Sequence, residues 1–583
     1  MQRRTFRLCC AVVLGRSILR IFLIITGILV FFVVLGIIDR IRKKRERYEK
    51  VKRSFGVKPT ETMSSERYQS LKVYLNSLPA GSTDIDEITW NDLEMEHIFA
   101  ELNHTCSAVG EEVLFAYLHK PQTDGRELAE REKLISLFEK KEDVRVETGV
   151  ALLTMGKMRR ISVYDYIMRL HSVPKEENAK HYAALFLYAV SVALMIFGFS
   201  GYGIGLFFAV AMWNTTTYLK RKGQIQPYLD AVSYISRLVR QTDGLAERLS
   251  AEDDPVLCRM TEDIRKDTAQ LRSFVFGASF LSADNPTGGD LLELVMDYIR
   301  MIFHIDLIQF NRIYRTFESK QEELNRLFAA TGKIDAMRAV ASYRTYRKNY
   351  AIPVFHEEVQ HSLKVWGICH PLVENPVANS IAANRPVLLT GSNASGKSTF
   401  LKTLAVNAIL AQTIHTVIAE SYEADYFRVL SSMALRDDLA AKESYYIVEI
   451  RSLKRILEAA EAHNTSVLCF VDEVLRGTNT AERIAASSRI LRYLAEQEAL
   501  VFAATHDLEL TGMLADVYDN YHFTENVSEE AVTFDYMLKP GKATSRNALK
   551  LLAMMDYPKK ITEDANIAVE HFLATGEWKV REG

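Results

Sequence analysis

The stretch PVLLTGSNASGKSTFLKTL, at residues 386–404, constrains the fold of this chain more than any other feature. Gly391, four further residues, and then Gly396, Lys397 and Ser398 match the pattern G-x-x-x-x-G-K-[ST]. A short apolar strand is predicted before the pattern and a helix after it. In this arrangement glycines let backbone N–H groups converge on phosphate oxygens beside the positive end of a helix. The stretch therefore predicts a phosphate-binding loop and an α/β domain around it.

The side chains of this loop have distinct expected roles. Lys397 is expected to reach the β- and γ-phosphates of a nucleoside triphosphate, and Ser398 is expected to hold Mg²⁺. The predicted nucleotide-binding residues of the loop are Gly391, Ser392, Asn393, Ala394, Ser395, Gly396, Lys397, Ser398 and Thr399.

Two later apolar runs carry polar residues that fit the same site. SVLCFVDEV has Asp472 and Glu473 near its end, and ALVFAATH ends in His506. A carboxylate pair at a strand end predicts that Asp472 orients Mg²⁺ and that Glu473 polarises the attacking water. A lone histidine at a strand end is more often structural. After the two preceding motifs, however, we expect His506 to contact the γ-phosphate.

These motifs resemble those of the MutS family, the ABC-type ATPases of DNA mismatch repair. TGSNASGKST, VDEVLRGTNT (471–480) and ATHDLELT (504–511) are similar to the family's phosphate-binding loop, its Walker B motif with the following loop, and its histidine switch. The resemblance covers about residues 334–565. It implies ATP and Mg²⁺ as cofactors. It also implies a homodimer in which Ser444 and Asn479 of one subunit face the nucleotide held by the other.

A second, upstream match extends the resemblance. The segment 102–138 is similar to the start of the family's core, or lever, domain. Together the two matches predict an all-α lever region at 91–350, followed by an α/β P-loop NTPase domain of the ABC/MutS type at 351–583.

The chain also departs from the family pattern. The family's mismatch-reader and connector domains would precede residue 90, and the reader's Phe-x-Glu wedge is missing from that part of this sequence. Two Phe-x-Glu matches, at 355–357 and 523–525, lie beside or inside the predicted ATPase domain and are interpreted as chance. Lys442 stands where the family prefers glycine, which is expected to weaken contacts with the partner's nucleotide.

The N-terminal part contains 18 consecutive uncharged residues, from Ile21 to Ile38. This length is about the minimum for crossing a ~30 Å hydrocarbon core. Signal-peptide apolar regions are shorter and end at a small-residue cleavage site, whereas this run continues into basic residues, so a retained anchor is favoured. We accordingly expect a transmembrane anchor with a basic juxtamembrane segment at 1–53 and a polar linker at 54–90.

A second apolar stretch, from Tyr182 to Leu219, has 38 residues without a charge. It is too long for one membrane helix and fits two short ones, with four glycines at 198–205 where the chain would turn. Lys180 and the basic residues 220–222 flank it, as expected for a hairpin with both ends in the cytoplasm. The alternative is a buried core hairpin. The two stretches predict a multi-pass membrane protein with about three spans and cytoplasmic lever and ATPase regions.

Composition and patterning leave two classes of function open. The net charge is −2, which gives no global basic surplus for nucleic acid, and the six cysteines lack the spacing of a disulfide framework or a zinc site. Basic and aromatic residues interleave at 338–350, but on a helix such a pattern is more often a solvated face. The first class is a DNA-binding protein related to mismatch repair. The second is a membrane mechanochemical ATPase that contacts lipid and acts on an unknown protein partner.

Overall fold

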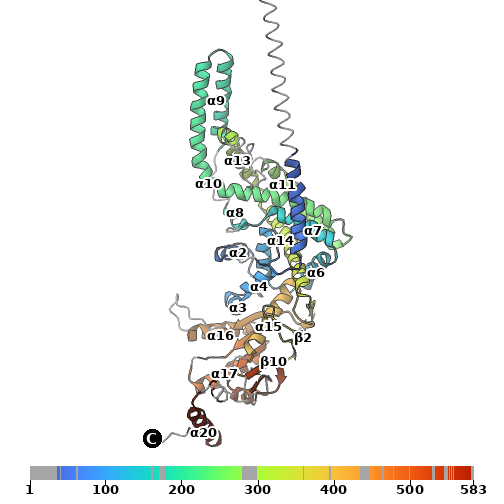
Figure 1. Cartoon of the computed structure of the whole chain (residues 1–583), viewed down its shortest axis with the longest axis vertical. Helices are drawn as coiled ribbons and strands as arrows, with labels where there is room; N and C mark the ends of the chain where they lie inside the picture. Colours follow the sequence, from blue (N-terminus) through green and yellow to red (C-terminus); the bar gives the residue numbers. More distant parts are fainter. Residues whose placement is uncertain are drawn as a thin grey trace, which may run out of the picture.

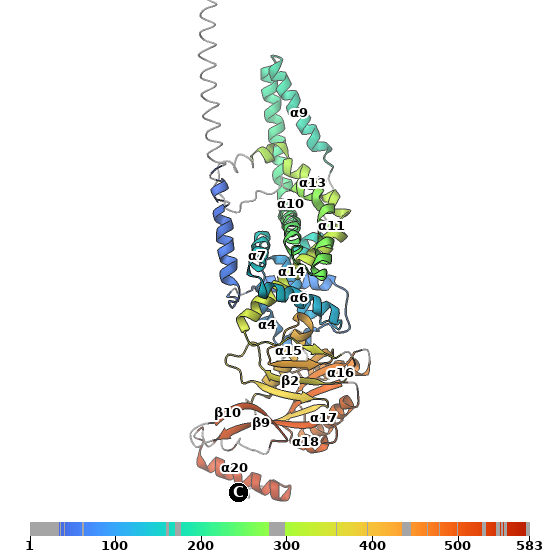
Figure 2. The ribbon, with the colours of Figure 1, turned by 90° about the vertical axis from the view of Figure 1, so that its right-hand side faces the viewer.

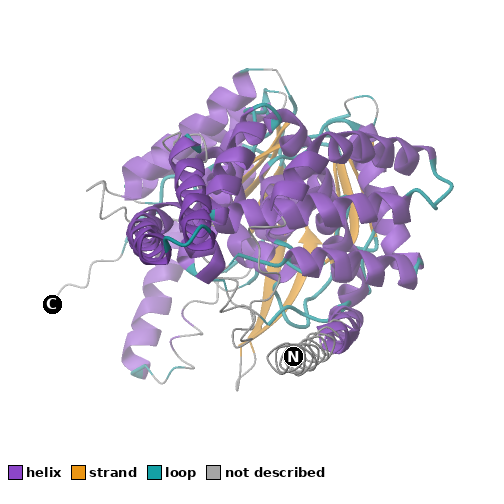
Figure 3. Ribbon diagram, turned by 90° about the horizontal axis from the view of Figure 1, so that it is seen from above, coloured by secondary structure: helices purple, strands orange, loops and turns teal. Residues whose placement is uncertain are grey.

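The computed structural model is elongated, with a helical region at one end and an α/β domain at the other (Figure 1, Figure 2). It describes residues 34–578 apart from several internal gaps. Figure 3, which looks down on the helical end, shows helices in front of the strands. The gaps are 35, 40, 61–62, 159–161, 170–176, 279–297, 357, 359, 393–394, 434–444, 463–464, 477, 498, 528–531, 544–548, 550–551, 553–554 and 556.

The long helix α14 (Gln321–Arg347) is the spine of the lever region, and α5 packs directly against it. Gly110 and Gly332 allow the close approach, since a Cβ at either position would lie 2.2 Å from a side-chain atom of the facing helix. Asp335 is fully buried and accepts a hydrogen bond from the backbone N–H of Ser107, the N-cap residue of α5. Further helices at this end of the molecule include α2 (Ser65–Ser77), α3 (Glu87–Asp92), α4 (Met95–Leu102), α5 (Ala108–His119), α6 (Gly125–Lys140), α7 (Glu142–Met155), α8 (Val163–Arg169), α11 (Pro255–Ala278) and α13 (Ile305–Glu318).

The interval 54–90 differs from the expected linker, because it contains α2 and part of α3. Tyr68, Leu71 and Tyr74 are buried in the core, and the ring of Tyr68 packs edge-on against Phe115 with centroids 5.4 Å apart. These three residues are spaced at three-residue intervals and form one apolar helix face. The surrounding Ser, Thr, Pro and Gly residues obscured that face in the sequence.

The stretch 182–219 forms two antiparallel helices that stand side by side at the end of the molecule far from the sheets (Figure 1, Figure 2). Helix α9 (Ala179–Ile196) and helix α10 (Ser200–Leu249) are joined by a turn in which Gly198 has φ 92°. Near the turn the Ser191 hydroxyl donates to the Gly203 carbonyl at 2.9 Å. Helix α10 runs far beyond the apolar stretch, into the lever region, so the hairpin and the lever share one continuous helix.

The surface of this hairpin is unusually apolar. Phe186 is 67% exposed and Phe197 is 79% exposed, and the other large exposed apolar residues of the hairpin include Val192, Ile196, Phe199, Ile204, Phe208, Met212 and Trp213. Among the described residues, α9 is the one helix that is long and apolar enough to cross a membrane. The first predicted span lies mainly outside the described residues, because residues 21–33 are not among them.

The C-terminal domain contains a six-stranded sheet in the order β10-β9-β4-β8-β7-β6. All neighbouring strands pair in parallel except β9 and β10, which are antiparallel. The central strands β4, β7 and β8 are short apolar runs that are almost completely buried, as is typical of parallel strands covered on both faces. The strands are β4 (Val387–Thr390), β6 (Arg428–Ser432), β7 (Val467–Asp472), β8 (Ala499–Thr505), β9 (Asp519–Val527) and β10 (Val532–Pro540).

The domain also contains a smaller four-stranded sheet in the order β1-β5-β2-β3. Its strands are β1 (Val354–Phe355), β2 (Leu363–Ile368), β3 (Asn379–Ala383) and β5 (Ser421–Ala424). The helices of the domain are α15 (Lys397–Ile414), α16 (Tyr445–Glu461), α17 (Thr480–Ala495), α18 (Glu509–Met513) and α20 (Lys559–Thr575).

Candidate nucleotide site

Three neighbouring strands of the large sheet end at the same edge, and each end carries predicted site residues. Thr390 of β4 lies in register with Thr505 of β8, and Asp472 of β7 lies in register with Ala504. The polypeptide leaves these strands at residues 391, 473 and 506. Because carboxyl ends of parallel strands meet at one edge, the phosphate-binding motif, the acidic pair and the histidine are brought together.

The glycine-rich loop is shaped by two residues with left-handed backbone conformations. Gly391 has φ 148° and Gly396 has φ 105°. A Cβ at Gly391 would lie 2.9 Å from the Phe523 carbonyl oxygen and equally close to the Ser395 hydroxyl. Helix α15 begins directly after the loop, so its first N–H groups face the loop. Asn393 and Ala394 lie outside the described residues, and Thr399 is exposed.

Lys397 is folded back into this loop. Its ammonium group donates to the carbonyls of Gly391 and Ser392 at 2.8 and 2.9 Å, and the residue is only 4% exposed. Burial lowers the pKa of Lys397, while the carboxylates of Asp472, Glu473 and Glu525 act in the opposite direction. The lysine is thus held at the place where the phosphates are expected.

Ser398 and Asp472 provide a chemically suitable place for Mg²⁺. The Ser398 hydroxyl is hydrogen-bonded to the Asp472 carboxylate, and Oδ1 of Asp472 is buried without a hydrogen-bond partner in the described part of the chain. Burial raises the pKa of Asp472, so a cation beside it would offset the cost of its buried charge. The described residues include no group of three or more His, Cys, Asp or Glu that could hold a metal alone. Mg²⁺ commonly binds through one or two protein ligands together with substrate phosphates and water.

Glu473 and His506 form a close pair beside this position. Nε2 of His506 lies 2.8 Å from Oε1 of Glu473 and 3.4 Å from Nζ of Lys397. Arg476 contacts the other carboxylate oxygen of Glu473 at 2.9 Å. The hydrogen bond from His506 is the largest of several contributions that hold the pKa of Glu473 below its usual range. Glu473 is therefore ionised at neutral pH and can accept a proton from water.

Ser444 and Asn479 are the two residues expected to act across a dimer interface. Ser444 lies outside the described residues. Asn479 is exposed at the N-terminus of α17, where its side chain accepts a hydrogen bond from the Ala481 N–H at 3.0 Å. Its role toward a second subunit stays a prediction.

The sequence did not indicate an acidic residue, Glu525, that contacts the glycine-rich loop. The Ser392 hydroxyl donates to the carboxylate of Glu525, which lies on β9 and is only 9% exposed. Glu525 belongs to the Phe-x-Glu match at 523–525 that we interpreted as chance. The position next to β4 is set by strand pairing, and no local sequence motif indicates it.

Glu525→Gln is expected to tighten ATP binding about 3–10-fold. The substitution removes a negative charge beside the glycine-rich loop and so relieves roughly 1 kcal/mol of repulsion between Glu525 and the ATP phosphates. The amide can still accept the hydrogen bond from Ser392. The measurement is the Kd for Mg²⁺-ATP by equilibrium binding, with the exposed Glu482→Gln as the matched control. An unchanged or weaker affinity of Glu525→Gln would contradict the expectation.

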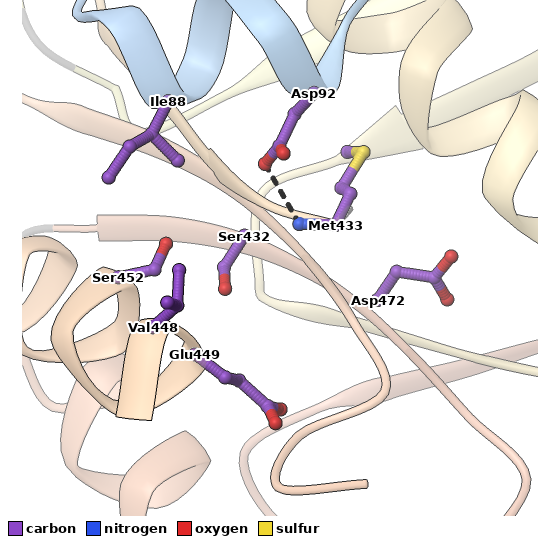
Figure 4. Close-up of a pocket in the computed structure, with 8 residues that line it drawn as sticks. All are labelled: Ile88, Asp92, Ser432, Met433, Val448, Glu449, Ser452 and Asp472. Atoms are coloured by element: carbon purple, nitrogen blue, oxygen red, sulfur yellow. Dashed lines mark hydrogen bonds between the residues drawn. The ribbon is translucent and has the colours of Figure 1, made fainter. Parts of the chain in front are cut away.

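A pocket beside Asp472 lies where the lever region meets the large sheet (Figure 4). Asp92, the last residue of α3, accepts hydrogen bonds from the Met433 N–H at 2.9 Å and from the Ser431 hydroxyl at 2.8 Å. The lever region thus holds the end of β6 one strand away from Asp472. The pocket is lined by Ile88, Asp92, Ser432, Met433, Val448, Glu449, Ser452 and Asp472.

The lever region also forms hydrogen bonds with the C-terminal end of α15, the helix that begins at Lys397. The backbone N–H of Gln122 donates to the Gln412 carbonyl at 2.8 Å, and the Arg131 guanidinium donates to the Thr413 carbonyl. Arg344 of α14 donates to the His415 carbonyl at 2.8 Å. Cationic donors at a helix C-terminus satisfy its free carbonyls and complement its dipole. One helix, α15, therefore joins the glycine-rich loop to the lever region.

These features define a class: a mixed α/β domain, with its candidate site at the carboxyl edge of a parallel sheet, attached to a helical region. Residues 387–573 match the family model of MutS domain V, the ATPase-domain region of that family. The C-terminal domain therefore belongs to the MutS family.

The curated relatives are DNA mismatch repair proteins MutS. The protein of Natronomonas pharaonis is 29% identical over 291 residues, which cover 48% of this chain and 33% of the relative. That of Thermus thermophilus is 30% identical over 266 residues, covering 45% and 32%. That of Thermotoga maritima is 31% identical over 266 residues, covering 44% and 33%. The matched part of the chain spans about a third of the length of these relatives.

Proposed function

We propose that this chain is a membrane-anchored ATPase that binds and hydrolyses ATP with Mg²⁺ and couples the nucleotide state to movement of its lever region. The observation that carries the proposal is the convergence of Lys397, Asp472, Glu473 and His506 at one edge of the sheet. The test is phosphate release from Mg²⁺-ATP by the full-length protein, compared with Glu473→Gln.

Each residue of the site has a step that its geometry supports. Lys397 holds the β- and γ-phosphates, and the N–H groups at the start of α15 complete the cradle. Ser398 and Asp472 would hold Mg²⁺, which when bound neutralises charge on the phosphates. Glu473 takes the proton of the attacking water. His506 orients Glu473 and lies beside Lys397, so it would contact the γ-phosphate.

The proposal includes a homodimer with ATP at the subunit interface. This part rests on the family resemblance, which assigns Ser444 and Asn479 to the partner's nucleotide. ATP binding closes the dimer and hydrolysis opens it. Arg344 and Asp92 transmit the change to the lever region. Arg344 is hydrogen-bonded to the end of α15, the helix that follows the glycine-rich loop, and Asp92 is hydrogen-bonded to the end of β6, the strand next to β7 and Asp472.

The proposed membrane attachment rests on the hairpin of α9 and α10. A packed soluble hairpin buries its large apolar side chains, whereas Phe186 and Phe197 are mostly exposed here. Lipid acyl chains are the environment that such a surface suits. The first apolar run, 21–38, adds the N-terminal anchor, which gives about three spans with the lever and ATPase regions in the cytoplasm.

The hairpin makes a topological prediction. A cysteine placed by Phe197→Cys is expected to react with a membrane-impermeant thiol reagent on intact cells or right-side-out vesicles. A cysteine placed by Lys222→Cys is expected to react only after permeabilisation, since it follows the hairpin on the cytoplasmic side. The background carries Cys9→Ser and Cys10→Ser, and that background alone is the control. Equal labelling of both positions from one side would show that the hairpin does not cross.

DNA binding in mismatch repair is the second candidate function, and the names of the relatives favour it. Binding to DNA through phosphate contacts must weaken steeply as salt rises. If the chain acts on a protein partner instead, neither homoduplex nor mismatched DNA is expected to bind with this salt dependence. Titration of homoduplex and mismatched DNA at two salt concentrations therefore separates the two candidates.

A further inference from the structure

The turn that presents Glu473 is conformationally strained. Glu473 has φ 59° and Leu475 has φ 56°, so two non-glycine residues within three positions adopt the left-handed region. Non-glycine residues rarely adopt this region, because the Cβ atom crowds the backbone, unless surrounding contacts hold them there. The Glu473 N–H is anchored to the Ala504 carbonyl of β8 at 2.9 Å. The end of the turn, at Leu475 and Arg476, requires a separate contact to hold it.

That support comes from Glu449, in the second turn of α16. Its Oε1 accepts the hydrogen bond of the Leu475 N–H, and the carboxylate is also hydrogen-bonded to the Arg476 N–H. Successive backbone N–H groups in this kind of turn form a concave site for an anion. Glu449 is 4% exposed, which excludes water as an equivalent acceptor for these groups. The side chain thus fills the anion site of the turn, although Glu449 lies 26 residues before Leu475 in the sequence.

The position of Glu449 also connects two parts of the site. Helix α16 follows the segment 434–444, where the resemblance places the serine that faces the partner's nucleotide. Glu449 lines the pocket next to Asp472 (Figure 4), and its Oε2 has no hydrogen-bond partner among the residues that the structure describes. The Glu449 side chain therefore links α16 to the Glu473 turn, so that a displacement of α16 would displace the turn.

We infer that Glu449 is a positioning residue for hydrolysis, holding the turn Glu473–Arg476 so that the Glu473 carboxylate stays beside His506. This inference rests on the proposed ATP hydrolysis and assigns to that site a residue that does not touch the nucleotide. Misplacing a catalytic group by about 1 Å can cost ~10²-fold in rate. Loss of Glu449 is thus expected to lower kcat without weakening nucleotide binding.

The test compares Glu449→Ala and Glu449→Gln with wild type in the full-length protein. Glu449→Ala is expected to lower kcat about 10–100-fold with a Kd for Mg²⁺-ATP within about 3-fold of wild type. Glu449→Gln keeps a carbonyl oxygen that accepts the same N–H groups, so it is expected to recover most of the rate. Glu458→Ala, an exposed carboxylate on the same helix that pairs with Lys454, is the matched control and should match wild type.

Hydrogen–deuterium exchange gives a readout that does not depend on activity. In Glu449→Ala, peptides covering 473–478 are expected to exchange faster, while peptides from β4 and β8 are unchanged. Parallel loss of nucleotide binding and of protection throughout the domain would overturn the inference in favour of a general folding role. Wild-type kcat and unchanged exchange in Glu449→Ala would overturn it as well.

The outcome also separates the inference from the proposal on which it rests. If wild type hydrolyses ATP, Glu473→Gln does not, and Glu449→Ala behaves as wild type, then only the role of Glu449 is wrong. If wild type and Glu473→Gln release phosphate at the same rate, the proposed function and the inference are overturned together.

Discussion

A protein carrying Glu473→Gln is expected to bind Mg²⁺-ATP as tightly as wild type and to hydrolyse it about 10²–10⁴ times more slowly. Glutamine has the same shape as glutamate and can keep the contact with His506, whose Nε2 lies 2.8 Å from Oε1 of Glu473 in the wild type. It cannot accept a proton from the attacking water. The measurement pairs kcat from phosphate release with Kd from equilibrium binding, at the same Mg²⁺ and salt concentrations.

The matched control is Glu482→Gln, which removes an exposed carboxylate in the first turn of α17 and should leave both quantities unchanged. The slow variant also tests the dimer, because trapped ATP should hold the closed state. We expect Glu473→Gln to sediment as a dimer with ATP. A Glu473→Gln protein that hydrolyses at the wild-type rate would exclude Glu473 as the base, and one that stays monomeric with ATP at high concentration would exclude the dimer.

The largest effect on stability is expected from Arg344→Met. Arg344 is completely buried, donates to Glu132 at 2.7 Å and lies 3.4 Å from Glu139, and it also donates to the His415 carbonyl. Methionine leaves those carboxylates without their buried cation, and removing one partner of a buried ion pair costs about 3–5 kcal/mol. A lower midpoint of thermal unfolding is therefore expected. Arg126→Met, which breaks an exposed pair with Asp124, is the control and should leave the midpoint unchanged.

The pH dependence of this effect follows from Glu132. Burial opposes ionisation of Glu132, but hydrogen bonds from Arg344 and His415 lower its pKa to about 2. A depressed carboxylate pKa contributes stability that is present above its usual value of 4.5 and is lost as pH falls toward 2. The difference in stability between wild type and Arg344→Met should thus be largest above pH 4.5 and shrink below it. A difference that is constant from pH 6 to about 3 would show that the ion pair is not its source.

Local sequence patterns predicted the residues at the ends of the central strands. Three apolar runs lead to Gly391, Asp472 and His506. Neighbouring parallel strands bring such residues together at one edge of a sheet, and β4, β8 and β7 are neighbours. The contacts of Glu449 and Glu525 follow no local pattern. Each depends on a helix or strand that packs against the site from elsewhere in the chain, so the sequence alone does not indicate them.

Two element boundaries show why other parts of the fold were harder to predict. The basic residues 220–222 end the apolar stretch, yet helix α10 continues to Leu249, because Lys and Arg are good helix formers. The apolar face of α2 was missed for a different reason. Tyr68, Leu71 and Tyr74 gain their burial from α5 and other distant helices, while their neighbours in sequence are polar.

The proposed function is tested most directly by ATP hydrolysis of the full-length protein in lipid vesicles, measured alone, with homoduplex DNA and with mismatched DNA, and with Glu473→Gln as the blank. We expect Mg²⁺-dependent hydrolysis that is absent in the blank and is not changed by either DNA. Stimulation by DNA that is larger for the mismatch and declines steeply with salt would contradict it and establish the mismatch-repair function instead.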